Sequence, residues 1–181
     1  MKKFKILGKK KIYGGAIFDL VRYNFELPDK KETFWDIIEH YGAVVIIPVT
    51  DTGDLVMVRQ YRPGPDAVML ELPAGKLDHP NENKQACALR ELEEETGYRA
   101  SRIEPLLEMY PVAAYCTEKM NLFLAEDLTP GKPSLDDDEF VEVELHSVTA
   151  LLDMIDNGEI LDMKTILGVQ YYARFLERAR L

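Results

Sequence analysis

An unbroken apolar segment at residues 43–49 constrains the fold of this chain more than any other feature. It reads Ala-Val-Val-Ile-Ile-Pro-Val. A continuous apolar run of this length is typical of a strand that is buried on both faces. A turn at residues 51–54 leads into a second apolar run at residues 55–61, and residues 68–72 predict a further short strand. These segments predict a buried sheet.

Three helices are predicted after these strands. The first follows Asn83, a favourable N-cap, and ends before Gly97, a residue type suited to the position after a helix. The other two cover residues 148–157 and about 163–180, and further strands are expected at residues 103–110, 119–125 and 140–145. Strands interrupted by one helix and completed by two predict an α/β sandwich, in which helices flank a mixed sheet.

Residues 1–40 are predicted to form a separate antiparallel β unit. Strand-like segments cover residues 3–12, 16–27 and 33–39, and Gly14-Gly15 between the first two is a strong hairpin signal. The remaining residues, 41–181, are long enough to form one domain with its own core.

Composition limits the classes of function. The net charge of −10 argues against a general nucleic-acid partner. The two cysteines, Cys87 and Cys116, lack the spacing of a metal or redox site, which favours a reducing compartment. We find neither an apolar run long enough to span a membrane nor a signal peptide. A cytoplasmic protein without a membrane partner is therefore expected.

The end of the first predicted helix carries acids where they are unfavourable. Residues 90–98 read Arg-Glu-Leu-Glu-Glu-Glu-Thr-Gly-Tyr, although a helix C-terminus already carries partial negative charge. Glu91 and Glu95 are a like-charge pair four residues apart, and with Glu94 they share one helix face. Such a cluster suits a hard divalent cation, and the alternative is a solvated acidic face.

With Gly75 and Glu82, this run resembles the Nudix box, Gly-x5-Glu-x7-Arg-Glu-U-x-Glu-Glu-x-Gly-U, where U is apolar. One departure is that six residues, and not five, separate Gly75 from Glu82. The extra residue falls in the turn-forming stretch 78–81, where an insertion is tolerated best. We expect Gly75 to adopt a backbone conformation closed to other residues.

The resemblance implies roles for the box residues. The carbonyl of Ala74 and the carboxylates of Glu91, Glu94 and Glu95 would hold Mg²⁺, with Mn²⁺ possible. Arg90 would orient the acids, acting through Glu82. The metal would polarise a diphosphate and activate water, so catalysis would depend on Glu94 and Arg90 as well as on a general base.

Segments outside the box are similar to the ADP-ribose pyrophosphatase branch of the Nudix family. They are residues 42–49, 58–63, 71–75 and 121–125, within a resemblance that spans residues 33–170. This implies a small-molecule nucleotide substrate, ADP-ribose, cut to AMP and ribose 5-phosphate, and a homodimer with exchanged N-terminal strands. Val112-Ala113-Ala114 replaces the usual Ser-Pro-Gly, which leaves GDP-mannose or another nucleotide sugar as the rival substrate. A nucleotide-binding module without catalysis is the third reading.

The same branch suggests four further site residues. Arg62 would grip the diphosphate, or it could be a structural arginine at a strand end. Trp35 would stack on the base, or it could serve core packing or a dimer contact. Glu139 would be the catalytic base, or part of a solvated acidic loop. Glu118 would lie in a loop that faces the substrate.

Overall fold

The computed structural model describes residues 3–135 and 140–179 of the chain. Its centre is the strand β4 (Ala43–Pro48), all six residues of which are buried. This strand lies inside a four-stranded sheet with the order β7-β4-β9-β8, formed with β7 (Ala74–Lys76), β8 (Arg99–Met109) and β9 (Met120–Thr129). The pairing of β4 with β9 is parallel and the other pairings are antiparallel, so the mixed sheet predicted from the sequence is confirmed.

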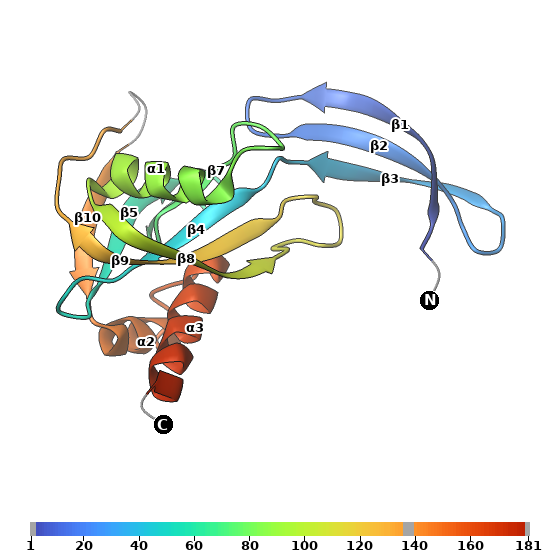
Figure 1. Ribbon diagram of the computed structural model, residues 1–181. Helices are drawn as coiled ribbons and strands as arrows, with labels where there is room; N and C mark the ends of the chain where they lie inside the picture. The colour runs from blue at the N-terminus through green and yellow to red at the C-terminus, as the bar shows by residue number, and fades with distance from the viewer. Residues whose placement is uncertain (1–2, 136–139, 180–181) are drawn as a thin grey trace.

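The side chains of β4 point alternately into two apolar cores, which explains its unbroken apolar sequence. Val44 and Ile46 pack with Leu92 of α1 (Lys84–Thr96). Val45 and Ile47 pack into the second core with α2 (Val148–Asp156) and α3 (Met163–Ala179). Figure 1 shows α1 on one side of the sheet and α2 and α3 on the other. The predicted α/β sandwich is confirmed. Within the described residues, none of these helices is long and apolar enough to cross a membrane.

A second, antiparallel sheet continues from the first. It has the order β10-β5-β6, formed by β5 (Leu55–Arg62), β6 (Ala67–Glu71) and β10 (Val141–His146). A bridge between Val49 and Leu55 connects the end of β4 to the start of β5. β6 pairs antiparallel with β5 and ends at Glu71, so that only Leu72 and Pro73 separate it from the start of β7.

The N-terminal β unit forms a three-stranded antiparallel sheet, as predicted. Its strands are β1 (Lys5–Gly14), β2 (Asp19–Glu26) and β3 (Glu32–Glu39). Figure 1 shows this sheet extending away from the rest of the molecule. At its base, the backbone of Ile38 exchanges hydrogen bonds of 2.8 and 2.9 Å with Tyr115 and Thr117. The sheet is therefore attached next to the loop that precedes β9.

The strands β7 and β8 differ from the sequence prediction. No separate strand was predicted at residues 74–76, but they pair with β4 as the short strand β7. Three residues that include a glycine give no periodic signal, so this pairing depends on the neighbouring strand. β8 begins at Arg99, four residues before the predicted start. Its first residues are polar because they lie at the outer edge of the sheet, where β8 has one partner, β9.

Candidate active site

Helix α1 places its carboxylates directly against β7. The backbone N–H of Ala74 donates a hydrogen bond of 3.0 Å to Glu95 Oε2, and Glu95 is only 6% exposed. The carboxylate of Glu91 lies against Gly75, where an added Cβ would be 1.9 Å from Glu91 Cδ. Gly75 does not have a positive φ. The expectation of a special backbone conformation is therefore wrong, and the missing side chain of Gly75 instead leaves room for the carboxylate of Glu91 to approach.

Arg90 contacts three of the box carboxylates. Its Nη1 lies 2.8 Å from Glu91 Oε1 and 2.9 Å from Glu94 Oε2, while Nη2 lies 3.5 Å from Glu82 Oε1. Glu82 Oε2 also accepts a hydrogen bond of 2.6 Å from the N–H of Asp78. The extra loop residue therefore does not prevent Glu82 from reaching Arg90. Burial would lower the pKa of Arg90, but the charge of Glu91 and the hydrogen bond to Glu94 raise it.

The donor chemistry of this face fits a hard divalent cation. It carries carboxylate oxygens, and Mg²⁺ and Ca²⁺ take such oxygens and backbone carbonyls, such as the one predicted at Ala74, as ligands. Glu91 and Glu95 are largely buried, whereas the side chain of Glu94 is 41% exposed. Within residues 3–135 and 140–179, no three side chains of the metal-ligating types converge on one point. Arg90 provides the positive charge beside two of the acids.

A cleft of about 270 Å³ opens beside the acidic face. Its lining includes Ala74, Gly75, Arg62, Glu118 and Lys164, so two of the predicted substrate-binding residues face the same space as a predicted metal ligand. These residues come from β5, β7, the loop before β9 and the start of α3. The arrangement combines carboxylates with the cationic side chains of Arg62, Lys76 and Lys164, as an anionic substrate bound through a metal would require.

Arg62 is held at the cleft by a buried carboxylate that the sequence analysis did not single out. Its Nε and Nη2 donate hydrogen bonds of 2.8 and 2.7 Å to the two oxygens of Glu71, which is 1% exposed. Lys164 Nζ lies 2.5 Å from Glu71 Oε2 and 3.0 Å from Asp162 Oδ2. Burial would raise the pKa of Glu71, but the hydrogen bond from Arg62 and the charge of Lys164 hold it below the ordinary value. A charged residue at the end of an apolar strand was the only local signal for Glu71.

The remaining predicted residues lie in different places. Trp35 packs in the N-terminal sheet, with ring centroids 5.0 Å from Phe25 and 5.7 Å from Phe4, and it does not line the cleft. Glu118 Oε1 is 3.6 Å from His40 Nδ1 at the cleft wall. Glu139 lies outside the described residues.

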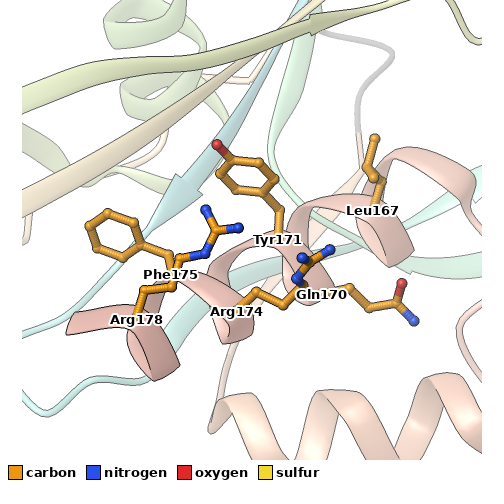
Figure 2. Close-up of a pocket in the computed structure, with 6 residues that line it drawn as sticks. All are labelled: Leu167, Gln170, Tyr171, Arg174, Phe175 and Arg178. Carbon is orange, nitrogen blue, oxygen red and sulfur yellow. The ribbon is translucent and has the colours of Figure 1, made fainter. Parts of the chain in front are cut away.

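A second hollow of about 190 Å³ lies along α3. Figure 2 shows its side chains on successive turns of that helix, and they are Leu167, Gln170, Tyr171, Arg174, Phe175 and Arg178. None of the predicted site residues lines it. Of the predicted site residues that the structure describes, Arg62, Ala74 and Glu118 line the cleft beside β7.

The motif and the geometry agree with a comparison against known protein families. The NUDIX domain matches residues 40–164. This chain belongs to the NUDIX family. The family resemblance and the fold class predicted from the sequence are thereby confirmed.

Two NUDIX relatives resemble the chain over most of its length. One is the ADP-ribose pyrophosphatase of Bacillus subtilis (strain 168), 38% identical over 92% of this chain and 91% of the relative. Another is the GDP-mannose pyrophosphatase of Yersinia enterocolitica serotype O:8 / biotype 1B, 34% identical over 85% of this chain and 87% of the relative. A solved structure described as an ADP compounds hydrolase has a similar fold, with a TM-score of 0.85 at 22% identity over 99% of this chain and 97% of that one.

Proposed function

We propose that this NUDIX protein is a pyrophosphatase that hydrolyses ADP-ribose to AMP and ribose 5-phosphate. The observation that carries the proposal is the packing of the acidic α1 face on Ala74 and Gly75, at the edge of a cleft that contains Arg62. Similarity to an ADP-ribose pyrophosphatase over almost the whole chain supports the choice of substrate.

The chain's own residues supply binding and orientation. Glu91, Glu94, Glu95 and the carbonyl of Ala74 would hold Mg²⁺, or Mn²⁺ in its place. When bound, the metal neutralises phosphate charge and makes water a better nucleophile. Water oxygen then bonds to one phosphorus as the bridging P–O bond breaks.

We propose that Glu139 accepts the proton from this water, because the resemblance to the ADP-ribose pyrophosphatase branch suggests it as the catalytic base. Arg62 would hold the diphosphate, and Glu118 would face the substrate from the loop before β9. Arg90 would keep the acids in position, since it contacts Glu91 and Glu94 from one nitrogen.

GDP-mannose is the second candidate substrate, and residues 112–114 are the reason to retain it. This segment lacks the proline that the ADP-ribose branch usually carries. The chain still turns here, because Cys116 N–H donates a hydrogen bond of 3.0 Å to the carbonyl of Val112. A turn held by hydrogen bonds and not by a proline ring could shape a different wall for the terminal sugar.

Substrate turnover tests the proposal directly. Purified protein with Mg²⁺ would be assayed against ADP-ribose, GDP-mannose and other nucleotide sugars, with release of the nucleoside monophosphate measured by chromatography. We expect the highest kcat/KM for ADP-ribose. A higher value for GDP-mannose would assign the protein to the second candidate. Absence of turnover with tight nucleotide binding would instead indicate the non-catalytic module.

A further inference from the structure

The buried carboxylate of Glu71 has no role in the chemistry described so far, yet it organises one wall of the cleft. It accepts hydrogen bonds from Arg62 on β5 and from Lys164 at the start of α3, 93 residues away in the sequence. Asp162 accepts a hydrogen bond of 2.6 Å from Thr165 Oγ1, and that same Oγ1 accepts one of 2.9 Å from the N–H of Leu72. The carboxylate therefore joins two strands to a helix.

The geometry of the Arg62–Glu71 pair determines which edge of the guanidinium is available to a ligand. A guanidinium carries five N–H donors in a rigid plane. Glu71 engages the side edge, through Nε and Nη2. The side chain of Arg62 is 36% exposed and lines the cleft, whereas Glu71 is 1% exposed, so the N–H groups that Glu71 does not engage are the ones left for a ligand. The end edge, formed by Nη1 and Nη2, can then receive two phosphate oxygens.

The surroundings connect this arginine to both sides of the cleft. The hydrogen bond to Glu71 raises the pKa of Arg62 most, and the charges of Glu95 and Asp162 raise it further. Glu95 belongs to the acidic face of α1, and Asp162 precedes α3. Arg62 therefore lies within electrostatic reach of Glu95, one of the carboxylates that we assign to the metal.

We propose that Glu71 is a positioning residue that fixes the guanidinium of Arg62 by its side edge and presents the end edge to a phosphate group of the substrate. Lys164 and Asp162 complete the support, since Lys164 shares Glu71 and Asp162 holds Lys164. The proposal rests on the proposed function, because it assigns Arg62 to the diphosphate. It differs from a merely structural ion pair in requiring one defined orientation of the guanidinium.

Chemical rescue tests that requirement. In Arg62→Ala we expect KM to rise at least tenfold with a smaller change in kcat, and guanidinium at tens of millimolar to restore part of kcat/KM. In Arg62→Ala/Glu71→Gln the same guanidinium should restore nothing, because the carboxylate that orients it is gone. Arg59→Ala is the matched control, since Arg59 lies on the same strand in a similar pair with Glu144. Sodium chloride at the same concentration controls for ionic strength.

Equal rescue with and without Glu71, or no rescue in Arg62→Ala, would overturn the positioning role. If circular dichroism shows that the double variant does not fold, Arg62→Lys provides a second test, because it leaves the buried carboxylate paired. We expect its KM to stay near that of Arg62→Ala, and a wild-type KM would overturn the proposal. The wild-type assay distinguishes failure of the proposed function from failure of the positioning role of Glu71. A wild-type protein that is inactive on every nucleotide sugar would reject both. If the wild type is active but guanidinium does not rescue Arg62→Ala, only the positioning role of Glu71 is rejected.

Discussion

At the scale of single residues, the carboxylates of α1 have different environments. Glu95 is buried and bonded to the N–H of Ala74, whereas Glu93 lies on another side of the helix and pairs with Arg99. Identical side chains on neighbouring positions therefore have different expected roles. Substitutions that keep size and remove charge can distinguish them.

We expect Glu95→Gln to lower kcat by about 10²- to 10³-fold, because it removes charge that stabilises the transition state and preserves packing. The glutamine oxygen can still accept the hydrogen bond from Ala74, so the thermal unfolding midpoint should change little. Steady-state kinetics and calorimetry check both statements. Glu93→Gln is the matched control and should keep the wild-type rate. A near-normal rate for Glu95→Gln would remove Glu95 from the metal ligands.

Gly75 gives a second prediction at this scale. Gly75→Ala introduces a Cβ where the carboxylate of Glu91 lies, so this carboxylate must move. The end of this flexible side chain can move at small cost, so the free energy of unfolding should fall by less than about 1 kcal/mol, whereas kcat should fall because Glu91 leaves its position. Urea unfolding and kinetics measure the two effects. Gly64→Ala is the control, because a Cβ at Gly64 meets nothing within 4 Å. Similar behaviour of both variants would show that Glu91 adjusts without loss.

At the scale of secondary-structure elements, β10 is joined to the second sheet through one partner strand. It pairs with β5 alone within the described residues. Across this pairing, Glu144 bonds to both Nε and Nη2 of Arg59, and Glu144 Oε2 lies 2.7 Å from His146 Nε2. The hydrogen bond from Arg59, with a contribution from His146, lowers the pKa of Glu144 from 4.5 to about 2.

This pair predicts how stability depends on pH. The carboxylate has a lower pKa in the folded state, so its contribution is complete above about pH 4.5 and is lost as the pH falls towards 2. Because the pair is partly exposed, we expect it to contribute roughly 1–2 kcal/mol. Glu144→Gln should remove that contribution at pH 7 and flatten the acid side of the stability curve, measured by urea unfolding between pH 3 and 7. Glu159→Gln, exposed between α2 and α3, should leave the curve unchanged. Identical curves for both variants would contradict the role of the pair.

The elements themselves were largely predictable, because their signals are local. Asn83 accepts a hydrogen bond from the N–H of Ala86, and Gly97 has a φ of +76°, so α1 begins and ends where the sequence indicated. β7 was not predictable, since its three residues form a strand only because Ala43 and Val45 of β4 offer them partners. An element such as α1, whose limits depend on its own capping residues, could be predicted from the sequence. The strand β7, which depends on pairing with β4, could not.

At the scale of the whole molecule, the N-terminal sheet exposes several large apolar side chains to solvent. Its exposed apolar side chains are Ile6, Leu7, Ile12, Tyr13, Phe34 and Trp35. A sheet of three strands that extends from the body has little core of its own. The predicted homodimer would cover this surface, and stable dimers bury about 1,200–2,000 Å² in total.

We expect light scattering with size-exclusion chromatography to give the mass of a dimer for the intact protein. Phe34→Asp should shift the population towards the monomer, because it places a charge on the exposed sheet. Val68→Asp is the control, since Val68 is exposed to a similar extent but lies on β6, away from the N-terminal sheet. A monomeric wild type, or a dimer unaffected by Phe34→Asp, would reject this interface.

The sequence by itself determined which chemistry the molecule can hold. The spacing of Arg90, Glu91, Glu94 and Glu95 fixes their common helix face, since 3.6 residues per turn is a local property. The unbroken apolar run of β4 indicates a strand that is buried on both faces, because successive apolar residues point to opposite faces of the sheet. Neither inference needs knowledge of distant partners.

Only the tertiary structure decided how these parts meet. It set Glu91 against Gly75, joined Arg62 to Lys164 through the buried Glu71, and placed Trp35 among the rings of the N-terminal sheet and away from the cleft. The physical reason is that ion pairs and close approaches form between groups far apart in the chain. Their partners are selected by the packing of strands and helices, which no local periodicity records.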